Sequence, residues 1–484
     1  MLFTSFKFVA FFVTLFVIYW GIGRISKSIQ NWILLIASYI FYGIAEWKLL
    51  PLLIVATVVF YYLGISISQT IGRKQSLLKL IGVILGLGTL LYFKYFNFFI
   101  ESFAELFNSL GLTTNWHTFN IIMPLGVSYF TFKLISYVLE IERGKILPCE
   151  DFVAFAIYVG FFPTILAGPI DRPNKFIPQL SEKRLFSFAL GFDGVQQIVW
   201  GLFKKVMIAD NLSPVIDGVW NNLADASGST ILLSLILYTF QMYADFSGYS
   251  DMAIGISKLL GIQIARNFNY PFFATNIAEF WKRWHISLTG WLTDYVFIPL
   301  NIKFRDWGNL GIILAIIINM VLVGMWHGAN WTYAVFGLYQ GLLFIPVILS
   351  GKMNKKQKLV LNRFGLPKIL DMGKMVGIMM LYTIGIILFR AENLSQSWVV
   401  ISGMCDASLF TIPSIISKRI QFVIIIIALM MICEWFSQKK EYVLQPTGNH
   451  WKHIVGWILC DYILLSLMIL KGNFGTNQFI YFQF

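Results

Sequence analysis

The sequence has little charge and few of the residues that usually perform chemistry. Only 13% of its 484 residues are charged and 57% are hydrophobic, whereas about a quarter of a soluble domain is charged. This composition excludes a soluble enzyme, a disordered protein and a nucleic-acid binder. The four cysteines form no Cys-x-x-Cys pair, so they support neither a metal site nor a disulfide framework. The sequence also lacks internal repeats and low-complexity segments.

Long apolar runs take the place of the missing charge, and they are typical of membrane-spanning helices. Because an open sheet edge is not stable in lipid, we predict an all-α polytopic membrane protein, a single domain over residues 1–484. Residues 5–23 lack a small-residue cleavage site and are predicted to remain as the first span. We expect about 11 to 13 transmembrane helices plus re-entrant or interfacial helices. The further spans are predicted near residues 31–47, 49–68, 80–100, 119–138, 152–168, 188–209, 230–257, 310–325, 331–349, 373–389, 420–436 and 454–471.

The formal net charge is +13, and much of it lies in short clusters. Lys and Arg are enriched in cytoplasmic loops of membrane proteins, so we interpret the clusters as markers of cytoplasmic ends. They are Arg73, Lys74 and Lys79; Lys183 and Arg184; Lys204 and Lys205; Lys352, Lys355, Lys356 and Lys358; and Lys418 and Arg419.

Two of the five histidines lie in unusual surroundings. His327 separates two apolar runs, and an ionisable residue at membrane depth indicates a functional site. Imidazole accepts a proton near neutral pH, which suits activation of a hydroxyl. Gly324 and Gly328 would let another backbone or a narrow substrate approach closely, and Trp326 and Trp331 offer flat walls. The alternative is a neutral histidine hydrogen-bonded inside a helix bundle. For His117, His450 and His453 we expect surface or interface positions.

His285 follows Trp281 and Trp284 in a stripe that continues through Leu288, Trp291 and Tyr295. Steps of three and four residues are typical of one amphipathic helix. Glu279 and Arg283 stand at i and i+4, where they can pair. Taken alone, the pattern favours an interfacial helix anchored by tryptophan and charge.

Residues 238–255 continue an apolar run but contain Asp245. In a helix, Tyr238, Gln241, Asp245 and Tyr249 fall on one face. A buried carboxylate needs donors, and this face supplies two phenols and an amide. Asp245 either orients a histidine or a substrate hydroxyl, or belongs to a structural network that joins helices.

Proline and glycine interrupt the apolar run of residues 160–173. Non-helical backbone at membrane depth is tolerated only where it lines protein or water. We therefore predict a broken or re-entrant helix here.

Six motifs in order resemble the membrane-bound O-acyltransferase family, and in particular its bacterial branch that O-acetylates alginate and other exported polysaccharides. The similarity extends from residue 1 to about residue 341, with residues 120–341 as the catalytic core; residues 350–484 are C-terminal spans without a recognised motif. The motifs are Pro124–Phe132, Phe162–Pro163 with Ala167–Pro169, Gly201–Lys205, Asp245–Asp251, Arg283–Leu288 and Trp326–Trp331.

The resemblance implies a helical enzyme around a central tunnel in the bacterial cytoplasmic membrane. His327 is then the catalytic histidine and His285 the supporting one. The donor is acetyl-CoA or another acyl thioester from the cytoplasm, with no tightly bound cofactor and no metal. Donor phosphates would meet basic residues, although loop topology explains these residues equally well; they are Lys204, Lys205, Lys282 and Arg283. We assign substrate binding to Asp245, Gln241, Tyr249, Trp326, Asn330 and Arg283.

The expected partners are membrane lipid, the acyl-thioester donor, an exported polysaccharide acceptor and an outer-face acetyltransferase protein, but no nucleic acid. One alternative is the membrane protein of teichoic-acid D-alanylation. Another, of a different class, is a glycan or lipid-linked sugar transporter that uses Asp245 and the histidines as a proton relay. The absence of inverted internal similarity disfavours the transporter.

Overall fold

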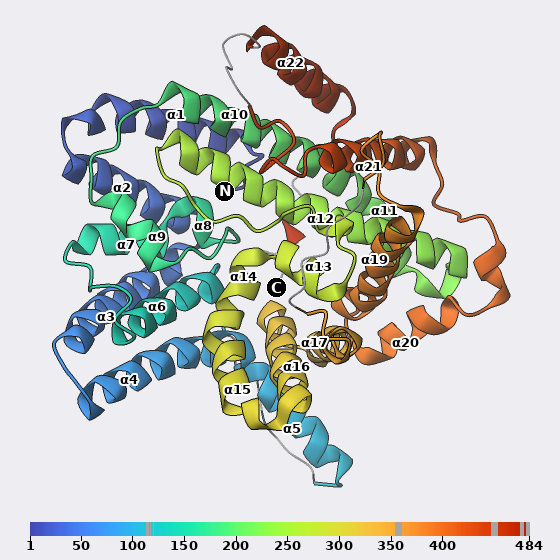
Figure 1. Cartoon of the computed structure of the whole chain (residues 1–484), viewed down its shortest axis with the longest axis horizontal. Helices are drawn as coiled ribbons and strands as arrows, with labels where there is room; N and C mark the ends of the chain where they lie inside the picture. Colours follow the sequence, from blue (N-terminus) through green and yellow to red (C-terminus); the bar gives the residue numbers. More distant parts are fainter. Residues whose placement is uncertain are drawn as a thin grey trace. The chain divides into compact units, whose positions relative to one another are not determined.

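The computed structural model describes residues 1–112, 116, 118–119, 121–353, 361–446, 454–474 and 479–480. These residues are mainly helical (Figure 1). Within them, β-type pairing is limited to an isolated antiparallel bridge between Leu361 and Pro367. The chain divides into two compact units, the first formed by residues 1–195 and 253–265 and the second by residues 196–252 and 266–484. The single domain over residues 1–484 stays a prediction.

The first unit is built around α6, whose side chains are buried on almost every face. Helices α3 and α4 pack against it. Gly86 of α4 allows the close approach, because a Cβ there would lie 2.6 Å from Cγ1 of Ile135. The helices of this unit are α1 (Phe6–Gly21), α2 (Lys27–Glu46), α3 (Leu50–Ser68), α4 (Arg73–Leu90), α5 (Phe96–Ser109), α6 (Val127–Glu142), α7 (Phe152–Gly160), α8 (Phe162–Ile165) and α9 (Pro173–Phe176).

Two helices cross the boundary between the units, α10 (Phe188–Phe203) and α12 (Gly228–Leu259). The 32 residues of α12 correspond to about 48 Å of helix. The second unit contains the π-helical segments η5 (Lys204–Ala209) and η8 (Thr293–Phe297). Its helices are α11 (Asp210–Asn221), α13 (Ile277–Arg283), α14 (Ile286–Leu292), α15 (Ile298–Lys303), α16 (Gly308–His327), α17 (Trp331–Leu342), α18 (Ile345–Leu349), α19 (Ile369–Arg390), α20 (Leu394–Gly403), α21 (Lys418–Phe436) and α22 (Ile454–Lys471).

Several stretches are long and apolar enough to cross a membrane, which confirms the prediction of an all-α multi-pass membrane protein. Among the described residues they number seven: Phe6–Ile25, Lys27–Ser68, Arg73–Ser109, Arg305–His327, Trp331–Leu349, Ile369–Arg390 and Lys418–Phe436. The Lys27–Ser68 stretch holds both α2 and α3. Other predicted spans fall on shorter helices, such as α6 and α10 with 16 residues each.

The predicted broken helix at residues 160–173 is confirmed. Helix α7 ends at Gly160, α8 has only four residues, and α9 begins at Pro173. The segment is buried, and Ser38 accepts a hydrogen bond from the backbone N–H of Phe162 at 3.2 Å. A side chain therefore satisfies a backbone donor that the broken helix leaves open.

One basic cluster departs from the cytoplasmic assignment. Helix α19 has 22 residues and ends at Arg390, after which α20 has only ten, too short to cross back over a ~30 Å hydrocarbon core. Next, the backbone N–H of Ser414 donates to Thr230, in the first turn of α12, at 2.9 Å. Lys418 and Arg419, at the start of α21, thus lie at the end of α19 that carries Arg390. The basic residues that precede α19 lie at its other end. The cytoplasmic assignment holds for only one of these two clusters.

Candidate functional site

His285 sits in a break between two short helices of the second unit, α13 and α14. Its backbone φ of 45° is uncommon for a residue other than glycine. The single interfacial helix suggested by the tryptophan stripe is therefore wrong. Its three tryptophans are also buried instead of facing an interface, because Trp281, Trp284 and Trp291 are each at most 6% exposed.

A buried asparagine holds the His285 turn in place. The carbonyl of Asn267 accepts from the backbone N–H of Ile286 at 2.9 Å, and its side-chain oxygen accepts from Ser287 at 2.5 Å. The amide nitrogen of Asn267 donates to Ser250 of α12 at 3.2 Å. The His285 turn is thus held by the Asn267 segment, which is itself bonded to α12, as a strained backbone requires.

The two histidines face each other in a closed aromatic cluster. His327 ends α16 and is 4% exposed, whereas His285 is fully buried. Their ring centroids are 6.1 Å apart, and the Trp326 ring lies edge-on 5.5 Å from His285 and 5.1 Å from His327. Phe246 closes the cluster beside His285 at 4.7 Å, and Phe389 beside His327 at 5.1 Å. The histidines are 42 residues apart in the sequence, but together they form one site.

Burial decides the charge of His285, which lies outside the long apolar helices. Removal from water lowers the pKa of its imidazole to about 3, because burial penalises the charged form of the ring. His285 is therefore neutral at physiological pH. A neutral imidazole supplies one donor and one acceptor.

Two other sequence motifs meet at a crossing of α10 and α12. A Cβ on Gly201 would lie 2.6 Å from the carbonyl oxygen of Gly248, and one on Gly248 would lie 2.7 Å from that of Gly201. Small residues allow such close approach of helices. The crossing brings the lysines that follow Gly201 against the acidic residues of α12.

Lys204 and Lys205 are buried in this crossing, so they are neither loop residues nor free to meet a donor phosphate. Lys204 pairs with Asp251 at 2.6 Å. Lys205 pairs with Asp245 at 2.6 Å and with Asp210 at 2.9 Å. Isolated buried charges are unfavourable, and each lysine here has at least one carboxylate.

The predicted polar face of α12 is buried, but its members have different partners. Besides Lys205, Asp245 accepts from the backbone N–H of Ile480 at 2.7 Å, which favours the structural-network interpretation. Tyr249 packs edge-on against Phe479 at 4.8 Å. The side-chain oxygen of Gln241 is buried without a hydrogen-bond partner among the described residues.

The remaining predicted site residues make local contacts. Arg283 pairs with Glu279 at 2.6 Å, which confirms the predicted i, i+4 pair. Asn330 caps α17 by accepting from the backbone N–H of Thr332 at 2.9 Å, and it donates to the carbonyl of Glu392 at 2.7 Å. Asn330 therefore fixes the loop that follows His327.

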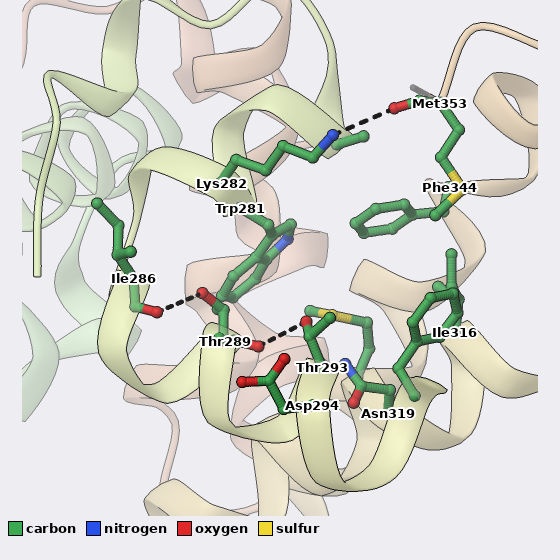
Figure 2. Close-up of a pocket in the computed structure, with 14 residues that line it drawn as sticks. Trp281, Lys282, Ile286, Thr289, Thr293, Asp294, Ile316, Asn319, Phe344 and Met353 are labelled. Atoms are coloured by element: carbon green, nitrogen blue, oxygen red, sulfur yellow. Dashed lines mark hydrogen bonds between the residues drawn. The ribbon is translucent and has the colours of Figure 1, made fainter. Parts of the chain in front are cut away.

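The second unit contains a cavity of about 350 Å³, and Figure 2 shows the residues that line it. Ile286, the residue after His285, lines it, as does Met320, two turns before His327 on α16. Lys282 reaches across one edge and donates to the carbonyl of Met353 at 3.4 Å (Figure 2). The other walls are Ala278, Trp281, Thr289, Gly290, Thr293, Asp294, Phe297, Ile316, Asn319, Phe344 and Met353. This size falls within the range of small-molecule sites.

Sequence reasoning gave no site role to Asn267, to Phe389 or to Phe246, which lies inside the Asp245–Asp251 motif. Asn267 stands in a segment without periodicity, and the two phenylalanines are indistinguishable from core residues. The remaining histidines, His117, His450 and His453, lie outside the described residues.

Comparisons with known proteins give a consistent assignment. Residues 147–381 match the sequence profile of the membrane-bound O-acyltransferase family. A probable alginate O-acetylase of Azotobacter vinelandii is 35% identical over 84% of this chain and 78% of its own length. A peptidoglycan O-acetyltransferase of Helicobacter pylori is 32% identical over 77% of this chain and 73% of its own length. A teichoic acid D-alanyltransferase of Bacillus subtilis is 34% identical over 49% of this chain and 62% of its own length.

Proposed function

The chain belongs to the membrane-bound O-acyltransferase family, and from this we propose that it moves an acetyl group from a cytoplasmic thioester toward hydroxyls of an exported cell-envelope polysaccharide. The membership makes it an O-acyltransferase and not a transporter. The observation that carries the proposal is the pair of buried histidine rings 6.1 Å apart. The names of the alginate and peptidoglycan relatives support a polysaccharide acceptor. The chain would act in the bacterial cytoplasmic membrane, with an outer-face acetyltransferase partner protein.

The distribution of charge orients the site. Six Lys or Arg residues and no acidic residue lie between residues 350 and 370, so this loop is placed in the cytoplasm. Helices α17 and α18 lead into the loop and α19 leaves it. Arg390, at the far end of α19, then faces the outer side. His327 faces the same side, because the loop of Asn330 joins it to the start of α17, the end away from the cytoplasmic loop. The cavity lies toward the cytoplasmic end, because Phe344 and Met353 line it.

The cavity suits an acyl-thioester donor. Its walls are mainly apolar, and Lys282 at its edge is placed to meet a donor phosphate. Met320 in the wall precedes His327 by seven residues, about 10 Å along α16. A donor that enters from the cytoplasm would therefore bring its thioester toward the histidines.

His327 acts as the general base in this proposal. It takes the proton of the acceptor hydroxyl, the oxygen attacks the thioester carbonyl, and the thiolate leaves and gains a proton. His285 stays neutral and positions the reacting groups by hydrogen bonding. Trp326, beside both rings, excludes water, which would otherwise hydrolyse the thioester.

The test is acetyl transfer by the full-length protein in proteoliposomes with radiolabelled acetyl-CoA. His327→Gln should lower transfer by at least about a hundredfold, the usual range for loss of a general base, while insertion is unchanged. The matched control is Thr383→Val, which removes a buried hydroxyl paired with Thr239 at 3.0 Å in the same unit. Transfer by His327→Gln at the wild-type rate would exclude His327 as the base.

The donor pocket has its own test. Lys282→Ala should raise the KM for acetyl-CoA with little change in kcat, because a charge that meets the donor phosphate contributes to binding of ground state and transition state alike. Lys303→Ala, an exposed position on α15, is the control. If acetyl-CoA supports no transfer and only a carrier-protein thioester does, the D-alanylation alternative is favoured.

A further inference from the structure

Arg390 ends α19 beside His327 and has no role in the mechanism above. Its guanidinium carbon lies 5.7 Å from the ring centroid of Trp220 and 5.6 Å from that of Tyr238. One terminal nitrogen donates to Asp217 at 2.6 Å. The four residues come from α11, α12 and α19, all in the second unit; we call them the Arg390 cluster.

The Arg390 cluster retains unused hydrogen-bonding groups in a buried setting. Nε of Arg390 and Nε1 of Trp220 are buried, and neither has a hydrogen-bond partner in the part of the chain that the structure describes. The buried side-chain oxygen of Gln241 also has no hydrogen-bond partner among the described residues. Gln241 lies one helical turn from Tyr238, on the same face of α12. Buried polar groups are almost always paired in native proteins. Two donors and one acceptor therefore indicate a polar ligand.

The Arg390 cluster has one exposed member and is next in sequence to a residue that packs on His327. The side chain of Asp217 is 47% exposed, whereas Trp220 is only 5% exposed. Phe389, the residue before Arg390, packs against the His327 ring. By the charge argument above, this end of α19 faces the outer side, opposite the donor cavity.

The charges of the cluster indicate the class of ligand. The positive charge of Arg390 is offset by Asp217, whose other oxygen already accepts from Ser213 at 3.0 Å. A carboxylate ligand would meet no net positive charge here. A hydroxyl satisfies the open groups better, because its oxygen accepts from N–H donors and its proton goes to an oxygen such as that of Gln241.

From these observations we propose that the Arg390 cluster is an acceptor subsite, which binds the hydroxyl groups of a neutral sugar on the outer side and leads them to His327. The inference rests on the proposed function for the identity of the reaction. Arg390 and Trp220 supply the donors, and Asp217 and Tyr238 hold the guanidinium in place.

Two conservative variants isolate the donors. Trp220→Phe keeps an aromatic ring but removes Nε1–H. Arg390→Lys keeps the charge beside Asp217 but removes Nε and the planar fork. The matched controls are Trp398→Phe, an indole that is 69% exposed on α20, and Arg419→Lys, whose partner is Asn211.

The experiment measures binding of fluorescently labelled cellotetraose to the full-length protein in detergent, so neither donor nor turnover is needed. Wild type and His327→Gln should bind it saturably, and Trp220→Phe and Arg390→Lys should bind about fivefold or more weakly, as expected for a lost hydrogen bond. The controls should bind like wild type. Tetramannuronate, an acidic sugar, should bind more weakly than cellotetraose.

Three results would overturn the subsite. They are no saturable binding by wild type, equal binding by wild type and both cluster variants, and preferential binding of tetramannuronate. If His327→Gln binds the sugar while wild type transfers no acetyl group, the proposed function fails and the subsite stands.

Discussion

Removal of Lys205 should destabilise the protein more than removal of either of its acidic partners. Lys205, Asp245 and Asp210 are each at most 3% exposed in their side chains. Lys205→Met leaves two carboxylates close together in a buried place without a cation. Breaking a buried pair in this way costs about 3–5 kcal/mol of unfolding free energy.

Asp245→Asn is a milder change of the same network. Lys205 keeps Asp210 at 2.9 Å, and the amide oxygen of asparagine still accepts from the N–H of Ile480. The loss is then close to that of one charged hydrogen bond, about 1.5–3 kcal/mol. The double variant Lys205→Met, Asp245→Asn should be less destabilised than the sum of the single variants, because it leaves one carboxylate and not two.

The assay is equilibrium unfolding of the purified full-length protein in mixed micelles, followed by tryptophan fluorescence. Lys303→Met, an exposed lysine of α15, is the control and should change the unfolding free energy by less than about 0.5 kcal/mol. Equal losses for Lys205→Met and Asp245→Asn, or additive losses in the double variant, would refute the account of Lys205 as the shared counter-ion.

Three further predictions concern the same region. Burial raises the pKa of Asp210 from 3.8 to about 7, against the opposing effect of Lys205. The contribution of Asp210 to stability should therefore fall as pH rises from about 4 to 7. In Asp210→Asn, the unfolding midpoint should depend less on pH over this range. Asn267→Ala should lower kcat at least about tenfold through the His285 turn, with the donor KM unchanged, whereas Asn222→Ala at an exposed helix end should not. His285→Gly should be more stable than His285→Ala by about 1 kcal/mol, since glycine accepts a positive φ; equal unfolding midpoints would contradict the strain.

Local signals in the sequence were sufficient for some features. The prolines and glycines of residues 160–173 predicted the broken helix because they act on the backbone directly. Glu279 and Arg283 predicted their ion pair because helical spacing fixes it. The partnership of His285 and His327 came from family resemblance, since no local pattern in the 41 residues between them predicts that the two rings meet.

Other features depend on contacts between distant segments, which no local pattern reveals. Lys204 and Lys205 resembled a basic loop, but the Gly201–Gly248 crossing buries them against α12. The tryptophan stripe around His285 has helical periodicity, yet periodicity is insensitive to one residue with positive φ. Asn267 supplies the hydrogen bonds that hold this conformation, and a single polar residue in an irregular segment gives no signal of such a role.

The Asp245–Asp251 segment of α12 contacts both the buried lysines and the His285 turn. Its two acids neutralise both buried lysines, Ser250 binds Asn267 at the His285 turn, and Phe246 packs on His285 itself. One segment of α12 thus joins the lysine crossing to the His285 turn. Because buried charge pairs tolerate little displacement, a shift of α10 against α12 would move the His285 ring. Under the proposed function, the buried charges of this site would act on catalysis through position, while His327 and the cavity would act on the substrates directly.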